Sequence, residues 1–117
     1  MNRLRVPADE LDEDDITVTF WRGEPFSGIS EERYPDGALR FELEHTNGIP
    51  DGLSRSYWPD GGLHRETWLN YGIRVRVRSW YRNGQIEEDL WTAQSSFPKH
   101  FTWAEDGTMT RSDVSGT

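Results

Sequence analysis

The sequence predicts an all-β fold, an elongated and open antiparallel meander of β-hairpins that repeats about every 24 residues. Three observations predict it. The glycines Gly37, Gly61, Gly84 and Gly107 are 24, 23 and 23 residues apart, and similarity at a fixed period is typical of repeat architectures. Each of these glycines follows an Asp or Asn, a pair that favours a tight hairpin turn. Glycine or proline interrupts each stretch before three helical turns could form, which argues against helices.

Short strands are expected on both sides of every turn. Aromatic residues precede the four turns, and an aliphatic residue or Met stands two positions after each glycine. Short strands joined by tight turns pair most simply with their neighbours in sequence. We therefore expect strands at residues 16–21, 29–34, 39–45, 53–58, 63–69, 75–81, 86–92 and 100–104.

The chain divides into three segments by composition. Residues 1–15 form an acidic N-terminal segment, and the sequence leaves open whether this segment is ordered. Residues 16–107 form the β-repeat domain. Residues 108–117 form a small, polar tail that we expect to be frayed.

Composition narrows the class of function. The 117 residues are 33% hydrophobic but 13% aromatic, which suits a thin sheet with half-buried Trp and Tyr side chains. The formal net charge of -8 argues against a general nucleic-acid binder and suits a basic partner. The chain has no Cys, which fits a cytoplasmic protein, and it has no apolar run of membrane-spanning length.

Four segments carry a resemblance to a known family. They are "RGEPFSG" at 22–28, "YPDGALRFE" at 34–42, "YWPDGGLHRE" at 57–66 and "WYRNGQIEED" at 80–89. The repeat resembles the variant MORN repeat, and the arrangement over about residues 20–107 is similar to the YwqK-type antitoxin proteins. The resemblance implies a run of MORN-like β-hairpins in one extended sheet. It also implies an antitoxin or immunity protein that binds a secreted bacterial toxin, including toxins that act on nucleic acids.

Three acidic residues recur at the same position of the repeat. Glu42, Glu66 and Asp89 follow their turn glycines by five residues, so a regular sheet would place them in one row across the strands. Cross-strand ion pairs with Arg40, Arg65 and Arg55 are the structural interpretation of this row. Contact with a partner is the functional one.

The aromatic residues allow the same two interpretations. In the pairs Tyr57-Trp58 and Trp80-Tyr81, one side chain must face each side of the strand, so one can pack while the other is exposed. Trp68 and Trp91, each seven residues after a turn glycine, predict a second aromatic row. Exposed Trp and Tyr anchor many protein interfaces, and the sequence leaves packing and partner binding equally open.

The remaining candidates are acids and histidines. Asp12, Glu13, Asp14 and Asp15 form a solvated run that can also serve as an acidic docking segment. The histidines His45, His64 and His100 occupy unlike repeat positions, which argues against a histidine metal site. Turn chemistry explains the Asp-Gly pairs, which argues against calcium loops. We therefore expect no metal and no cofactor. No Ser-His-Asp spacing, phosphate loop or nucleophile elbow is present, and we expect no enzyme.

These observations favour a non-catalytic protein-binding module in the cytoplasm. The expected partner is a cognate protein toxin with a basic surface, whose active site the chain blocks. We expect no direct binding of nucleic acid and no membrane contact. The alternative is a structural scaffold protein that forms homo-oligomers through its sheet edges.

Overall fold

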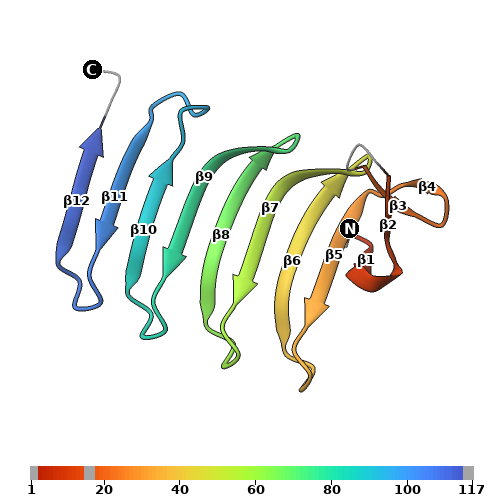
Figure 1. The fold of residues 1–117 in the computed structure, drawn as a ribbon, viewed down its shortest axis with the longest axis horizontal. Helices are drawn as coiled ribbons and strands as arrows, with labels where there is room; N and C mark the ends of the chain where they lie inside the picture. The colour runs from red at the N-terminus through yellow and green to blue at the C-terminus, as the bar shows by residue number, and fades with distance from the viewer. Residues whose placement is uncertain (1–2, 15–17, 115–117) are drawn as a thin grey trace.

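The structure, a computed structural model, describes residues 3–14 and 18–114. Its main feature is an open nine-stranded sheet in the order β1-β5-β6-β7-β8-β9-β10-β11-β12 (Figure 1). From β5 onward every strand pairs antiparallel with its neighbour in sequence, so the predicted all-β meander is confirmed. The strands of this sheet are β1 (Arg5–Pro7), β5 (Gly28–Arg33), β6 (Leu39–Thr46), β7 (Ile49–Tyr57), β8 (Leu63–Asn70), β9 (Ile73–Trp80), β10 (Ile86–Trp91), β11 (Lys99–Trp103) and β12 (Met109–Val114).

The four turns at one end of the sheet share one design (Figure 1, lower ends of the strands). In the β5–β6 hairpin the side chain of Asp36 accepts a hydrogen bond from the backbone N–H of Ala38 at 2.9 Å. Gly37 has φ +92°, a conformation that L side chains rarely adopt. The same side-chain contact recurs in the other three turns, made by Asp60, Asn83 and Asp106. The pairs at 36–37, 60–61, 83–84 and 106–107 are therefore hairpin turns, as predicted. The turn expected at Asp51-Gly52 is wrong, because both residues lie inside β7.

The turns at the other end of the sheet are shorter. Asn47-Gly48 joins β6 to β7 and Tyr71-Gly72 joins β8 to β9, with positive φ at both residues of each pair. That geometry is the type I′ turn, whose twist matches the twist of the flanking strands. The β10–β11 connection at the same end is longer and spans residues 92–98.

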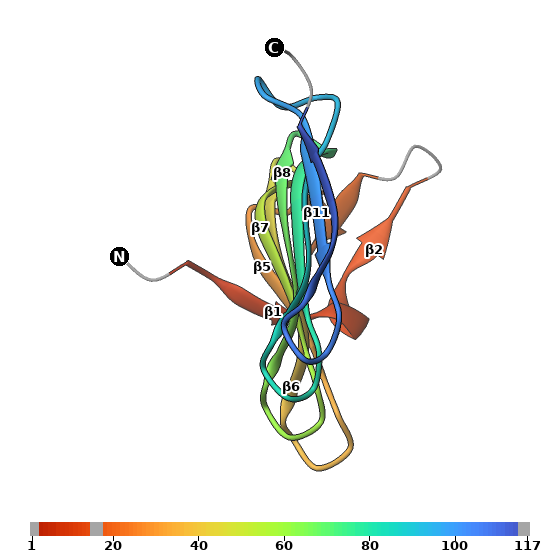
Figure 2. The same cartoon turned by 90° about the vertical axis from the view of Figure 1, so that its left-hand side faces the viewer.

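Each hairpin at the Asp-Gly end also carries a β-bulge. The register shifts leave one residue without an opposite partner just after the turn, in β6, β8, β10 and β12. A bulge increases the local right-handed twist. Figure 2 shows the result edge-on, a twisted single layer with β2 standing out to one side.

Both predicted segment boundaries differ from the structure. Residues before 16 join the main sheet, because Arg5–Pro7 forms β1, which pairs parallel with β5 and buries Val6. Residues after 107 continue it, because Met109–Val114 forms β12 against β11 where we expected a frayed tail. The polar composition of β12 suits an edge strand, since all six of its residues are exposed.

A second, small sheet packs against the β6–β7 turn. It contains β2 (Asp12–Glu13), β3 (Thr19–Trp21) and β4 (Glu24–Pro25), and a 3-10 turn (Ala8–Glu10) leads into it from β1. Gly48 donates a backbone hydrogen bond to Phe26 and accepts one from Thr19, at 2.7 and 2.8 Å. Phe26 is buried and lies 5.3 Å, ring centre to ring centre, from the buried His45. This contact forms the main core of an otherwise single-layered protein.

Candidate partner-binding surface

One face of the main sheet carries the three predicted acids in a single row. The register pairs Glu42 with Arg55, Arg55 with Glu66, Glu66 with Arg78 and Arg78 with Asp89. Residues that pair directly across neighbouring strands share a face. The predicted row of acids is therefore present, with an arginine between each two members. We call this side of the sheet the charged face.

Arginines neutralise the first two acids of this row. Arg5 donates to Glu42 at 3.0 Å, and the Nε of Arg55 donates to Glu66 at 2.8 Å. The Tyr57 hydroxyl also donates to Glu42, at 3.0 Å. The hydrogen bond with Glu66 raises the pKa of Arg55, and burial together with the bond to Glu42 raises the pKa of Tyr57. The Glu42 and Glu66 side chains are only 13% and 11% exposed, so they mainly stabilise the sheet.

The third acid is held by two hydrogen bonds from one side chain. Arg76 donates from Nε and from Nη2 to the two carboxylate oxygens of Asp89, at 3.0 and 2.9 Å. Such a paired contact fixes the planes of both groups. Arg76 and Asp89 side chains are 22% and 15% exposed, so water screens this pair less than it would screen a pair on an open surface.

Two of the three arginines that we expected to neutralise the acids do something else. Arg55 does pair with Glu66, but Arg40 pairs with Glu32 at 3.0 Å. Arg65 lies on the opposite face, because its register partners are Ser56 and Ser79. Sequence reasoning missed the third neutralising side chain, that of Arg76. The alternation in "IRVRVRSW" was the available signal, since arginines two apart on a strand share a face.

The second predicted aromatic row lies beside the acids. Trp68 pairs with Arg76, Arg76 with Trp91, and Trp91 with Lys99, so these four side chains form one row on the charged face. The guanidinium carbon of Arg76 lies 4.0 Å from the Trp91 ring centre and 5.1 Å from that of Trp68. The Lys99 ammonium lies 4.9 Å from the Trp91 ring centre. Both tryptophans are half-buried; Trp91 lies between two cations, and Trp68 contacts Arg76.

Arg78 and Trp80 extend this row along β9. The guanidinium carbon of Arg78 lies 5.1 Å from the Trp80 ring centre, and its Nε is buried without a hydrogen-bond partner. Within residues 3–14 and 18–114, neither Arg78 nor Lys99 forms an ion pair. We define the tryptophan patch as Trp68, Arg76, Arg78, Trp80, Trp91 and Lys99. It contains three cations, of which Arg76 alone has an ion-pair partner in the part of the chain that the structure describes.

Three of the four aromatic residues predicted ahead of the hairpin turns, Tyr57, Trp58 and Tyr81, contact the sheet itself. Tyr57 lies on the charged face with Glu42, whereas Trp58 stacks on His64 with ring centres 4.0 Å apart. The Tyr81 hydroxyl donates to the backbone carbonyl of Trp103 at 2.8 Å, one repeat further along the chain. Trp58 and Tyr81 therefore lie outside the tryptophan patch, and their contacts are those of packing.

The N-terminal acids lie in the small sheet, away from the patch. Asp12 and Glu13 form β2 and are exposed. Asp14 accepts a hydrogen bond from the backbone N–H of Val18 at 2.8 Å, which closes the β2–β3 connection. Asp15 lies outside the described residues. We expected these acids and the exposed aromatics to supply one contact, and the structure does not bring them together.

Glu13 instead lines a hollow of about 620 Å³ on the opposite face of the main sheet. The hollow lies between the small sheet and the turn ends of β6–β9, and His45 and Leu43 line it. Burial lowers the pKa of His45, so the neutral imidazole is favoured there. Tyr71 and Ile73 on its rim are 60% and 51% exposed.

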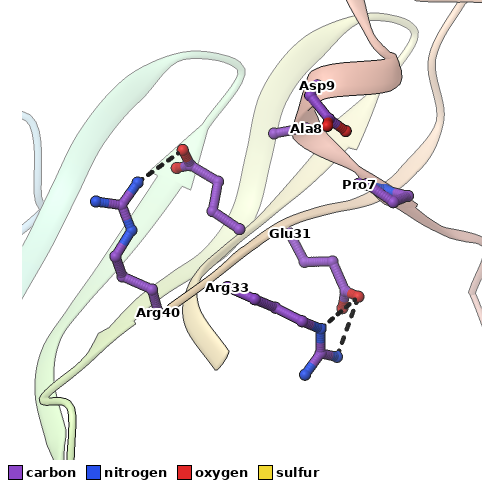
Figure 3. A pocket seen from close by; sticks show the side chains of 7 residues that line it. Pro7, Ala8, Asp9, Glu31, Arg33 and Arg40 are labelled. Carbon is purple, nitrogen blue, oxygen red and sulfur yellow. Dashed lines mark hydrogen bonds and ion pairs between the residues drawn. The ribbon is translucent and has the colours of Figure 1, made fainter. Parts of the chain in front are cut away.

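A smaller hollow of about 380 Å³ lies where the pairing of β1 with β5 ends, next to Pro7 and Glu31 (Figure 3). Its two arginines are already paired: Arg33 donates twice to Glu31, at 3.1 and 3.3 Å, and Arg40 donates to Glu32. Among the residues that the structure describes, no three His, Cys, Asp or Glu side chains converge to hold a metal ion. This hollow therefore has the composition of an ion-paired sheet edge.

Comparison with known proteins identified no relative. The chain matches no protein-family model, no curated protein and no solved structure. The described part contains no helix of the length and apolarity that crossing a membrane requires.

Proposed function

We propose that this chain is a non-catalytic protein-binding module of the antitoxin or immunity type. It binds a cognate bacterial toxin in the cytoplasm and blocks the active site of that toxin, which acts on nucleic acid. The observation that carries the proposal is the tryptophan patch, where three tryptophans and two arginines lie together on one sheet face. Trp and Arg are enriched among the residues that dominate binding energy at protein interfaces.

The patch is ordered before any partner arrives. Arg76 is fixed by two hydrogen bonds to Asp89, and the same side chain lies against the rings of Trp68 and Trp91. Side chains that are already immobilised lose less conformational entropy on binding, so more of the contact energy contributes to affinity. An open sheet face with fixed aromatic side chains suits the surface of another protein better than a small molecule.

The acidic small sheet supplies the second part of the proposal. Asp12 and Glu13 are exposed and form no ion pair with the described residues, so their charge is available to a partner. With the net charge of -8, they favour encounter with a toxin whose surface is basic. The resemblance to YwqK-type antitoxins agrees with this kind of partner.

Co-expression with the toxin encoded beside the gene tests this function. The chain is expected to rescue cell growth and to retain the toxin on an affinity column. Trp91→Ala is expected to weaken retention at least tenfold, whereas Phe97→Ala, at a 71% exposed side chain in the β10–β11 loop, is expected to leave it unchanged. A chain that neither rescues growth nor retains the toxin would overturn the proposal.

The edge strand β12 favours a second candidate function, a scaffold that assembles through its sheet edges. All six residues of β12 are exposed, and its outer edge pairs with no strand in the described residues. Such an edge is a template for adding another strand. Sedimentation over a range of concentrations tests this function: a rise in mass that is lost in Ser112→Pro supports it, and a monomer at every concentration rejects it.

A further inference from the structure

We infer that the tryptophan patch binds an acidic, extended segment of the partner protein. The inference rests on the proposed function, because it takes the patch as a contact surface. It adds that the part of the partner that touches the patch is acidic. It departs from what the net charge of -8 alone indicates, since overall charge would predict a basic contact everywhere on the chain.

The first argument is the local charge. Arg76, Arg78 and Lys99 lie together on the charged face, and among the described residues only one carboxylate, that of Asp89, pairs with any of them. At the other end of the same face, Glu42 and Glu66 are matched by Arg5 and Arg55. The patch is therefore a positively charged area on an acidic protein, which complements an acidic surface.

The second argument is the unmet hydrogen-bonding capacity of Arg78. Its register partners on both sides are acids, Glu66 and Asp89, yet its guanidinium lies over Trp80, and its Nε is buried without an acceptor. An unpaired buried donor next to a charge costs free energy that a bound carboxylate would recover. Arg78 is therefore the side chain that gains most from an acidic partner.

The third argument is the spacing of the free cations. Arg78 is on β9 and Lys99 on β11, two strands apart. Lys99 also lies two residues along β11 from Phe101, the residue in line with Arg78, so the two cations are roughly 12 Å apart on a diagonal. Acidic residues four apart on an extended segment point to the same side and span about 13 Å. A segment that runs across β9, β10 and β11 would therefore place carboxylates over both cations and its apolar side chains over Trp91.

Synthetic peptides of ten residues provide the test, one rich in Glu and one rich in Lys, both with the same apolar residues. Quenching of tryptophan fluorescence is expected to saturate with the Glu peptide and not with the Lys peptide. Lys99→Gln combined with Arg78→Gln is expected to weaken the Glu peptide at least tenfold. Arg74→Gln, an exposed arginine of β9 without ion pair or ring contact in the described residues, is the matched control and is expected to change nothing.

Lys99→Gln alone and Lys99→Arg keep the test informative if the double variant folds poorly. The first is expected to weaken the Glu peptide and the second to preserve binding, because the charge is retained. Three results would overturn the inference: no binding of the Glu peptide, tighter binding of the Lys peptide than of the Glu peptide, or a Lys99→Gln variant that binds the Glu peptide as tightly as the unchanged protein does.

Other occupants of the patch give distinct results. Tighter binding of a thymidine oligonucleotide than of the Glu peptide would assign the patch to single-stranded nucleic acid and overturn the inference. Self-association that Lys99→Gln and Glu13→Gln both abolish would assign it to a second copy of this chain and would also overturn it. Toxin capture that persists while the Glu peptide fails would overturn this inference and leave the proposed function standing.

Discussion

Arg76 is the side chain whose removal should damage the charged face most. It donates both hydrogen bonds to Asp89, and its guanidinium contacts the rings of Trp68 and Trp91. Arg76→Ala removes these contacts together and leaves the Asp89 carboxylate, only 15% exposed, without its counterion. The substitution therefore tests whether the row of Trp, Arg and Asp side chains stabilises the sheet.

The expected cost follows from these contacts. A hydrogen bond to a charged group contributes about 1.5–3 kcal/mol, and each ring contact contributes about 0.5–1 kcal/mol at a partly exposed site. The contacts share one side chain and are partly screened by water, so they do not add fully. We expect Arg76→Ala to lower the free energy of unfolding by about 2–4 kcal/mol. The free energy of unfolding of Arg76→Lys should lie between those of the unchanged protein and of Arg76→Ala, because Lys keeps the charge but cannot donate both hydrogen bonds to Asp89.

Urea unfolding, followed by circular dichroism and tryptophan fluorescence, measures this cost. With a slope of about 2 kcal/mol per molar urea, the midpoint for Arg76→Ala should fall by about 1–2 M. Arg74→Ala is the matched control on the same strand, because Arg74 is exposed and has no ion pair or ring contact in the described residues. Its effect should stay within about 0.5 kcal/mol. Equal midpoint shifts in the two variants would refute the reasoning.

Three further predictions concern the turns, the small sheet and the core. Burial lowers the pKa of His45, so just below a pH of about 6.5 the unfolded chain binds more protons than the folded chain. The free energy of unfolding should therefore fall as the pH drops through that range. Urea unfolding at several pH values should show a weaker dependence of this free energy on pH in His45→Gln. Gly48→Ala should destabilise the fold more than Gly37→Ala. Both glycines have positive φ, but a Cβ at Gly48 would meet the backbone of β3, whereas a Cβ at Gly37 would have open space. Equal melting temperatures of the two variants would contradict this. Tyr81→Phe removes the hydrogen bond from the hydroxyl to the Trp103 carbonyl and should lower the free energy of unfolding, measured in urea, by about 1 kcal/mol. Tyr71→Phe is the control: Tyr71 is 60% exposed, and its replacement should not change this free energy measurably.

The meander was predictable because its information is local. The position of Gly37 and its equivalents requires a residue that accepts positive φ. The Asp or Asn before each glycine accepts a hydrogen bond from the backbone N–H two residues later, directly before the next strand. Each repeat contains its own turn, so residues one period apart in the sequence take equivalent positions two strands apart in the sheet. The rows of Glu42, Glu66 and Asp89 and of Trp68 and Trp91 follow from the same period.

The N-terminal contacts were not predictable, because they join residues far apart in the chain. β1 pairs with β5 across more than twenty residues, and Gly48 bonds both Thr19 and Phe26 without any repeat to indicate it. The partners of the acids were missed for a related reason. Arg40 and Arg65 are close in sequence to the acids, whereas register and the bulges decide which arginine reaches them.

Oxidation of side chains by hydroxyl radicals, compared between the free chain and the chain bound to its toxin, tests the central claim most directly. The claim is that the tryptophan patch is the contact surface, so Trp68 and Trp91 should be oxidised less in the complex. Phe97, a 71% exposed side chain of the β10–β11 connection, should be oxidised equally in both states. Unchanged oxidation of Trp68 and Trp91 in a complex that protects other residues would contradict the claim.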